Sequence, residues 1–405
     1  MTLIPLPGWA VAGGAAFPYD PNRTITQATK YYVSPTGSDA AAGTIGAPFA
    51  TLDHALTLSG PDVAILLMDG THTWSSIETK FIGASGTAIS PCLISSAPGH
   101  QPIIDCAADV AYGLSIEKSY WRVTHLALTN YTVGIRVAFN NTCTDIFLNN
   151  LLGTTTLGGD NKAMLSFTAS RTPSITLSRI RAINTGTSLH QNTGCIYFTR
   201  TTDSVMTLES IECIGAPVGI HFKHGNPAPA TQNATVTNVF LQGQTRWALG
   251  PNPSGVLFTN ILCGSGAKVL LGAANGSPAG EGIALNTFEH CTFYEGVNLS
   301  DVGALNTTFT NSIGLGFDVD SPSTVAAASN YNLLTGILNY GVSQTLAQWQ
   351  TSNSSDAASV GSNPTFVGTD FTTKAAYALS LGSAGKAAGT DGSDMGSDVT
   401  QVGIT

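Results

Sequence analysis

Charged residues are scarce in this chain, because Asp, Glu, Lys and Arg make up only 10% of its 405 residues. The net charge is −9 and no nucleic-acid-binding motif is present, so the sequence argues against nucleic acid as a partner. Hydrophobic residues nevertheless account for 42% of the chain, which argues against disorder. Few charges beside many Gly, Ser, Thr and Asn residues are typical of stacked strands joined by tight turns.

Long hydrophobic runs are also missing. No apolar stretch approaches the length of a membrane span, so membrane insertion is not expected. Residues 1–9 lack the basic start and the continuous apolar core of a signal peptide. An extracellular protein without a recognisable signal fits a phage virion protein, and a trimmed chain or unconventional export would look the same.

The seven cysteines show no CxxC pair and no zinc-ligand spacing, so no metal site is predicted from them. Several occupy apolar positions of the repeat described next, which favours buried free thiols. Cys92 and Cys106 form the one pair that we single out for a bridge. The odd count leaves at least one thiol over.

A polar-then-apolar phrase recurs along the chain, for example as Thr124-His125-Leu126 and Thr259-Asn260-Ile261. It is found at 124–126, 149–151, 178–180, 209–211, 237–239, 259–261, 289–291 and 311–313. Successive copies are 22 to 31 residues apart, which is typical of a solenoid. The sequence therefore predicts an all-β, single-stranded parallel β-helix, right-handed because parallel crossovers have that hand.

Three parts are expected along the chain. Residues 1–30 are rich in Pro and Gly and are interpreted as an irregular extension. Residues 31–325 form the β-helix, including a short amphipathic helix over 49–56 that caps its first coil. Residues 326–405 form a closing segment on the helix, with a helical turn at 346–349. The Asn residues of the recurring phrase are expected to satisfy turn backbones as a ladder.

Charge is uneven along the chain. Residues 111–250 hold ten Lys and Arg against six Asp and Glu, a local charge of +4, whereas the rest carries −13. This pattern fits either a groove for an acidic polymer or scattered, solvated charges.

A second strand series precedes several copies of the phrase. Side chains alternate between the two faces of a strand, so two outward columns are predicted. The first column contains Ser115, Arg136, Ser166, Tyr197 and His221. The second contains Glu117, Ala138, Thr168, Thr199 and Lys223. Arg136, Tyr197, His221 and Lys223 would then share one face, provided that the assumed register holds.

Residues 31–39, 43–44 and 48–52 resemble the opening of pectate-lyase-like right-handed parallel β-helix proteins. Residues 363–366, 391 and 394–396 resemble their closing segment. The resemblance implies the fold over roughly residues 31–400. It leaves the reaction open, because this superfamily includes polysaccharide lyases, glycoside hydrolases, epimerases and phage tailspikes.

Calcium-dependent members of that superfamily hold the ion with clustered carboxylates. Residues 118–202 contain only Asp145 and Asp160 as acids, in separate coils. Calcium takes six to eight oxygen ligands, so the sequence supports no calcium site and requires no cofactor.

The predicted basic face matches the demands of uronate β-elimination. A cation must neutralise the carboxylate, a base must remove the C5 proton and an acid can protonate the leaving oxygen. Arg136 or Arg200 could neutralise, Lys223 or His221 could be the base, and Tyr197 the acid. The resemblance adds that a Lys at the end of a Gly-Ile-x-x-Lys strand is a frequent active-site residue, which Lys223 matches loosely.

The same residues have plainer interpretations. Lys223 could be a solvated charge, the histidines could bond a turn, and Tyr197 could pack across strands. His224, Arg246 and Trp247 are candidate substrate contacts, with Trp247 stacking on a sugar ring or lying in the core. Hydrolysis instead needs two carboxylates, for which the candidates are Glu209 with Glu212, or Glu281 with Glu289 and Glu295, with Glu281 the better hydrolase candidate.

The sequence therefore predicts an extracellular protein that binds an acidic polysaccharide and cleaves it as a lyase. The alternatives are a glycoside hydrolase, a tailspike or fibre-like virion protein that is a homotrimer, and a purely structural surface protein. The sequence names neither the glycan nor the linkage.

Overall fold

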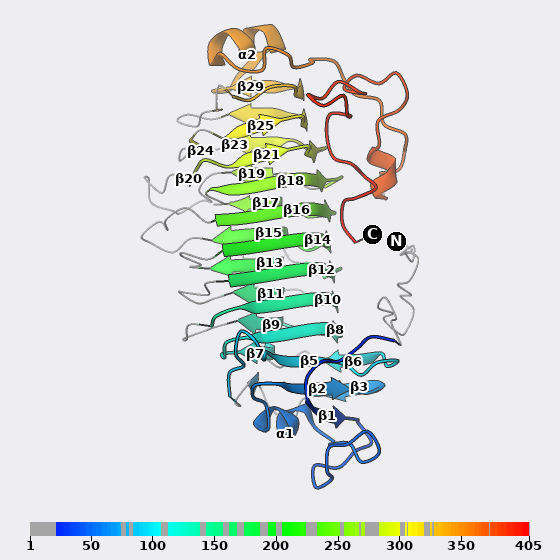
Figure 1. Cartoon of the computed structure of the whole chain (residues 1–405). Coiled ribbons are helices and arrows are strands. Elements are labelled where there is room, and N and C mark those ends of the chain that lie inside the picture. The colour runs from blue at the N-terminus through cyan, green and yellow to red at the C-terminus, as the bar shows by residue number, and fades with distance from the viewer. Residues whose placement is uncertain are drawn as a thin grey trace. The chain divides into compact units, whose positions relative to one another are not determined.

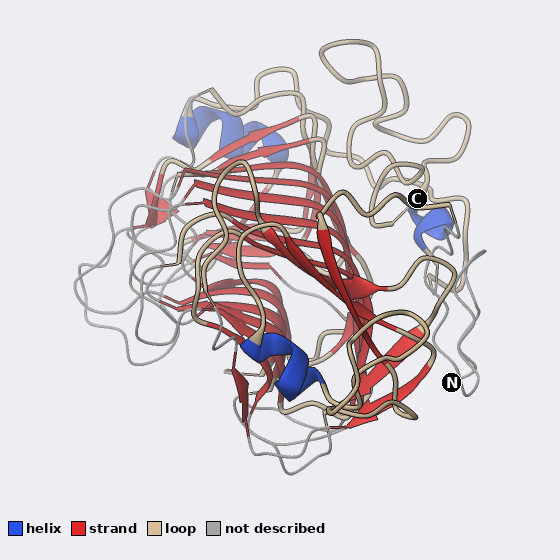
Figure 2. Cartoon of the chain, turned by 60° about the horizontal axis from the view of Figure 1, so that its bottom comes forward, coloured by secondary structure: helices blue, strands red, loops and turns tan. Residues whose placement is uncertain are grey.

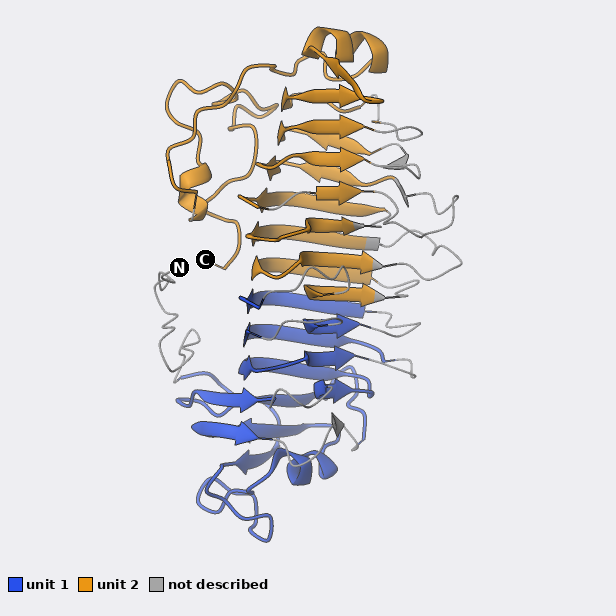
Figure 3. Ribbon diagram, turned by 180° about the vertical axis from the view of Figure 1, so that it is seen from behind, with its two compact units in different colours: residues 1–187 blue, residues 188–405 orange. Residues whose placement is uncertain are grey.

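The computed structural model describes residues 22–73, 78–80, 84–106, 112–137, 143–156, 162–167, 174–186, 193–199, 205–223, 233–251, 255–266, 269–271, 283–299, 304–305, 307–319, 325, 328–371 and 373–404. The chain divides into two compact units, residues 1–187 and 188–405 (Figure 3). Each unit is a stack of parallel strands, which confirms the predicted parallel β-helix (Figure 1).

The first unit contains two parallel sheets. One runs in the order β1 (Thr29–Val33), β2 (Val63–Leu67), β5 (Cys92–Ser96), β8 (Trp121–Thr129), β10 (Ile146–Thr155) and β12 (Ser174–Asn184), with β3 (Gly70–Thr73) paired to β6 (Pro102–Asp105) and β6 to β8. The other contains β4 (Glu78–Lys80), β7 (Tyr112–Ile116), β9 (Val133–Val137) and β11 (Ala163–Phe167).

The second unit repeats this arrangement. Its first sheet contains β14 (Val205–Gly215), β16 (Asn233–Gln242), β18 (Val256–Cys263), β21 (Thr287–Glu289), β22 (Thr292–Phe293), β25 (Thr308–Thr310), β26 (Ile313–Leu315) and β28 (Leu333–Thr335). Its second contains β13 (Gly194–Thr199), β15 (Val218–Lys223), β17 (Trp247–Pro251), β19 (Val269–Leu271), β23 (Val297–Leu299), β27 (Phe317–Val319), β29 (Ile337–Asn339) and the antiparallel β30 (Val342–Gln344). A separate pair joins β20 (Ile283–Ala284) to β24 (Ala304–Leu305).

The recurring phrase marks a bend in each coil of the first sheets. Its middle residue has a positive φ in seven of the eight copies, with values between 50° and 57°, and in the copy at 311–313 the first residue, Asn311, takes this role with a φ of 53°. Asn and Asp tolerate this left-handed conformation better than other residues that carry a Cβ atom, which explains why four of these eight positive-φ residues are asparagines. The apolar third residue is buried in every copy, as Leu126, Ile180 and Ile261 illustrate.

Side chains of the bends stack into a ladder inside each unit. Asn150 Nδ2 lies 2.9 Å from His125 Nε2, and Arg179 Nε donates to Asn150 Oδ1 at 2.7 Å. In the second unit Asn260 Nδ2 donates to Asn238 Oδ1 at 2.7 Å. A ladder is therefore present, but these bonds join side chains to one another rather than to turn backbones, and His and Arg take part as well as Asn.

Aromatic stacks fill the interior of the second unit. Phe198 lies against Phe222 with ring centroids 5.2 Å apart, and Phe258 against Phe288 at 4.5 Å, both nearly parallel. Parallel strands stand about 4.8 Å apart, so one phenylalanine per coil stacks on the next. This repetition builds a continuous apolar core.

One short α-helix follows β1 in the sequence, and another follows β30. Helix α1 (Leu52–Thr57) contacts β1 and β4, and Figure 2 shows it beside the first strands of its unit. It begins later than expected because Thr51 is its N-cap, which accepts from His54 N at 3.2 Å while Asp39 bonds the amides before it. Helix α2 (Leu346–Asn353) places the fully buried Trp349 edge-on against Phe317.

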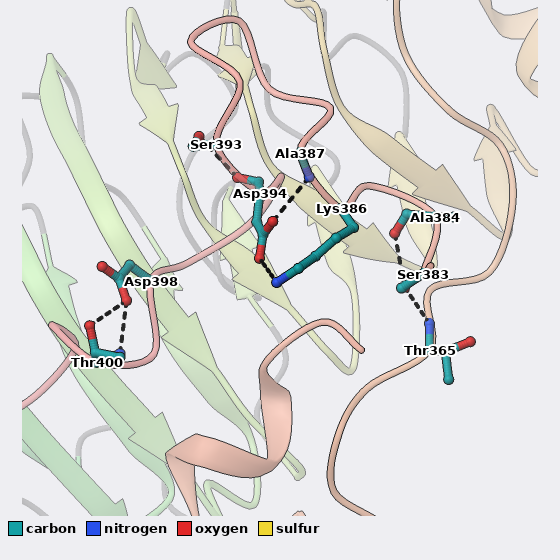
Figure 4. Close-up of polar contacts among 9 residues, drawn as sticks. All are labelled: Thr365, Ser383, Ala384, Lys386, Ala387, Ser393, Asp394, Asp398 and Thr400. Atoms are coloured by element: carbon teal, nitrogen blue, oxygen red, sulfur yellow. Dashed lines mark hydrogen bonds and ion pairs between the residues drawn. The ribbon is translucent and has the colours of Figure 1, made fainter. Parts of the chain in front are cut away.

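The segment after α2 runs along the bends of the second unit. Asp398 N donates to Asn260 Oδ1 at 2.7 Å, and Gly403 N donates to the Asn238 carbonyl at 2.8 Å. A short 3₁₀ helix (Lys374–Tyr377) contributes Tyr377 to an apolar cluster with Phe240 and Leu262. The segment also holds itself together, for example through Lys386 and Asp394 at 2.7 Å (Figure 4).

Candidate functional site

The first predicted column is present in the first unit as a row of paired residues. Arg136 on β9 is level with Ser115 on β7 and with Ser166 on β11. Its guanidinium donates to Ser115 Oγ at 2.8 and 3.1 Å, and lies 3.2 Å from Glu117 Oε1. The guanidinium also stands 3.7 Å from the centre of the Tyr112 ring.

These contacts bury Arg136, which is only 4% exposed. The outward groove expected from the sequence is therefore closed at this residue. A guanidinium that stacks on an aromatic ring and pairs with a carboxylate is well stabilised, and its charge is already compensated. Sequence reasoning did not include Tyr112 among the site residues. Its place at the start of β7, the strand that carries Ser115, was the signal that could have found it.

In the second unit the column continues with Tyr197 on β13 and His221 on β15, which face each other in register. Their rings meet edge to face, with centroids 4.7 Å apart and planes at 88°. His221 is 2% exposed, whereas Tyr197 is half-buried. The structure thus brings these two candidate residues together.

Lys223 is the last residue of β15 and pairs with Thr199 on β13. It follows His221 by two residues along the same strand. The second predicted column therefore has the assumed register within this unit. Arg200, His224 and Glu281 lie outside the described residues.

Arg246 and Trp247 stand at the start of β17 and contact each other. The guanidinium of Arg246 lies 4.4 Å from the centre of the Trp247 ring, and both residues are half-buried. One face of the indole is thus occupied by a cation, an arrangement that stabilises both groups.

The carboxylates considered for hydrolysis differ in their burial and in their contacts. Glu289 is half-buried on β21, level with Thr259 and Thr310. Glu209 is exposed on β14, whereas Glu212 on the same strand is 1% exposed and accepts from Ile404 N at 3.1 Å. Glu212 therefore anchors the C-terminal segment, a role that sequence reasoning missed because its partners lie about half the chain away.

The described residues do not fit a calcium site. Asp145 is bound by Arg122 through both carboxylate oxygens, at 2.7 and 3.0 Å, and Asp160 lies outside the described residues. Within the described ranges, no group of three or more His, Cys, Asp or Glu side chains is placed to hold a metal ion. Among the same residues, none of the helices has the length and apolar character needed to cross a membrane.

Residues 31–174 match the family model "Pel9A-like, right handed beta helix region". Over 132 residues the chain is 36% identical to pectate lyase PEL9 of Emericella nidulans, a stretch that covers 28% of this chain and 32% of that protein. The chain thus spans about a third of the length of the curated relative it matches.

Two solved structures are similar in outline. The crystal structure of pectate lyase Pel9A is 16% identical with a TM-score of 0.49, over 92% of this chain and 96% of that chain. A rhamnogalacturonan lyase is 12% identical with a TM-score of 0.49, over 84% and 90%. The match over residues 31–174 confirms the resemblance to pectate-lyase-like right-handed parallel β-helix proteins that the opening motifs indicated.

Proposed function

We propose that this protein binds an extracellular acidic polysaccharide beside strands β13 and β15 and cleaves it by β-elimination at a uronate. The observation that carries the proposal is the match of residues 31–174 to the Pel9A-like family model. The identity to a protein named pectate lyase over 132 residues supports the same substrate class.

The strands β13 and β15 supply the residues for the chemistry. Lys223 takes the C5 proton as the general base, and Tyr197 protonates the leaving oxygen at C4. His221 holds the Tyr197 ring through their edge-to-face contact at 4.7 Å. The substrate loses one proton from C5 to Lys223, and the leaving oxygen gains one from Tyr197, so the protons balance. The product carries a C4–C5 double bond.

The substrate carboxylate must be neutralised by a cation before its C5 proton becomes acidic enough to remove. Arg136 is a poor choice for this role because Glu117 already lies 3.2 Å from its guanidinium. Arg200 is the remaining candidate from the sequence. Arg136 instead stabilises the first unit through its contacts with Glu117 and Tyr112.

The test is incubation with a panel of uronate polymers, followed by the ultraviolet absorbance of the new double bond and by an assay of reducing ends. New absorbance supports β-elimination, whereas reducing ends without absorbance support a hydrolase that uses Glu281 and Glu289. Neither signal with any polymer would reject the enzymatic proposal.

A variant separates the role of Lys223 from the rest of the fold. Lys223→Ala should lower the rate about 10²- to 10⁴-fold, the usual contribution of a general base. Lys30→Ala, which removes an exposed lysine from β1, is the matched control and should keep full activity. Full activity of Lys223→Ala would assign the base to another residue.

A second candidate is a tailspike or fibre-like virion protein that binds surface glycan without cleaving it. The charge of the buried Arg136 is already compensated by Glu117. This favours the second candidate, because binding a glycan without cleaving it does not require a free cation at Arg136. The mass of the protein in solution tests this candidate, because a virion protein of this kind should be a homotrimer.

A further inference from the structure

Two cysteines of the second unit have their thiols in contact. Cys195 lies on β13 and Cys213 on β14, and the Cys195 side chain is close enough to Cys213 to help raise the pKa of its thiol. Cys195 is 2% exposed and Cys213 is fully buried. The contact joins the two sheets of the unit through its interior.

The repeat itself explains why these side chains meet. Cys195 stands between Gly194 and Ile196, whose partners on β15 are Val218 and Ile220, so Gly219 is at its level one coil on. Cys213 pairs in the same direction with Leu241. A Cβ atom on Gly219 would lie 3.1 Å from Leu241 Cδ2. The repeat therefore places Cys195 and Cys213 opposite each other within one coil, as it places Gly219 and Leu241 one coil on.

Other described thiols are directed at backbone carbonyl groups. Cys291 Sγ donates to the Glu289 carbonyl at 3.3 Å, and Cys92 Sγ donates to the Gly60 carbonyl at 2.9 Å. Cys143 Sγ is 3.7 Å from the Ile116 carbonyl. All seven cysteines are free thiols in the structure, Cys195 and Cys213 included, and Cys92 is directed at the Gly60 carbonyl.

We propose that Cys195 and Cys213 form a disulfide when the chain folds in a thiol-oxidising environment. The oxidant is a small-molecule disulfide such as oxidised glutathione. One cysteine thiolate attacks its sulfur and releases one glutathione thiol, and the second cysteine then attacks the mixed disulfide and releases the other. Two cysteine thiols are oxidised and one disulfide is reduced, so electrons and protons balance.

The reaction must precede the final packing of the coil. Burial and the neighbouring Cys195 raise the pKa of the Cys213 thiol well above its usual range, and packing shields both side chains from the oxidant. The bond therefore forms while β14 is still settling on β13. The inference rests on the extracellular location in the proposed function, since disulfides persist in oxidising compartments.

Trypsin offers a direct test, because Arg200 lies between the two cysteines. Complete cleavage places Cys195 in peptide 182–200 and Cys213 in peptide 201–223, and neither peptide holds another cysteine. The protein is folded with reduced and oxidised glutathione, alkylated in urea without reductant, digested and analysed by mass spectrometry.

A linked pair of these peptides, with five of the seven cysteines alkylated, is the expected result. Alkylation of all seven, or a link between other cysteines, would overturn the proposal. Cys263→Ser is the matched control, since it removes another buried thiol and should keep the link. Cys213→Ser should abolish it and leave Cys195 alkylated. No polysaccharide is used, so this result stands apart from the test of cleavage.

Discussion

The side chain of Asn260 donates to Oδ1 of Asn238 across 2.7 Å, and both residues hold a φ of 57°. Each asparagine therefore makes one bend of the coil and also ties it to the next bend. Asn260 Oδ1 accepts in turn from Asp398 N at 2.7 Å, so the ladder extends into the C-terminal segment. A single position of the repeat thus sets the backbone conformation, the stacking and the docking of the tail.

Replacing Asn260 should separate these contributions. Asn260→Gly keeps the positive φ without strain and loses the two hydrogen bonds, at a cost of about 1 to 3 kcal/mol. Asn260→Ala loses the same hydrogen bonds and should cost about 1 kcal/mol more than Asn260→Gly, because a positive φ is unfavourable for alanine. Urea unfolding of both variants measures the difference. Equal stability of the two would show that the bend imposes no conformational demand.

The sequence was sufficient to predict the repeat, because its signal is local. The alternation of apolar residues around Leu126 and Ile261 specifies which face is buried, and Leu52 and Trp349 lie in helices close to the predicted places. The register of Tyr197 with His221 also followed from counting coils. Each of these features depends on residues that are near in sequence or one repeat apart.

The environment of the candidate site could not be predicted in the same way. Nothing in the spacing of Arg136 shows that its guanidinium stacks on Tyr112 and is 4% exposed. The contact of Glu212 with Ile404 joins residues 192 positions apart. Burial and charge compensation arise from such non-local contacts, and a repeat pattern carries no information about them.

The ion pair between Arg136 and Glu117 should stabilise the folded state. The single variants Arg136→Met and Glu117→Gln each leave a partly or fully buried partner without its counter-charge, and each should cost about 1 to 3 kcal/mol. The double variant should cost less than the sum, by about 0.5 kcal/mol or more. Urea unfolding of the four proteins gives the coupling. Strict additivity would mean that the ion pair contributes nothing.

The buried carboxylate of Glu212 should determine whether the C-terminal segment stays docked. It lies 3.5 Å from Lys374 Nζ, and that ammonium also donates to the Val402 carbonyl at 2.7 Å and to the Ile404 carbonyl at 3.1 Å. Glu212→Ala removes the acceptor of Ile404 N and should cost about 3 kcal/mol.

Limited trypsin digestion reports on this docking, because Lys374 and Lys386 lie within the segment. Faster cleavage at both residues is expected in Glu212→Ala, with little change in Glu209→Ala, which removes an exposed carboxylate of the same strand. Equal rates in both variants and the parent protein would show that other contacts hold the segment.

Buried thiols should make the protein less stable at high pH. Burial raises the pKa of Cys92 to about 11 and the pKa of Cys143 to about 12, against an ordinary value of 9.0. Between the ordinary and the raised value the native state keeps protons that the unfolded chain has lost, so stability falls as pH rises. The loss of stability therefore begins near the ordinary value of 9.0 and grows until the pH reaches the raised values of about 11 and about 12.

Urea midpoints measured at about pH 8 and about pH 10 test this expectation. The parent protein should lose stability between the two values, and Cys92→Ala should lose less because one raised group is gone. The baseline cost of the substitution cancels, since only the difference between the two pH values is compared. An identical pH dependence in both proteins would show that the Cys92 thiol ionises as readily in the folded state as in the unfolded chain.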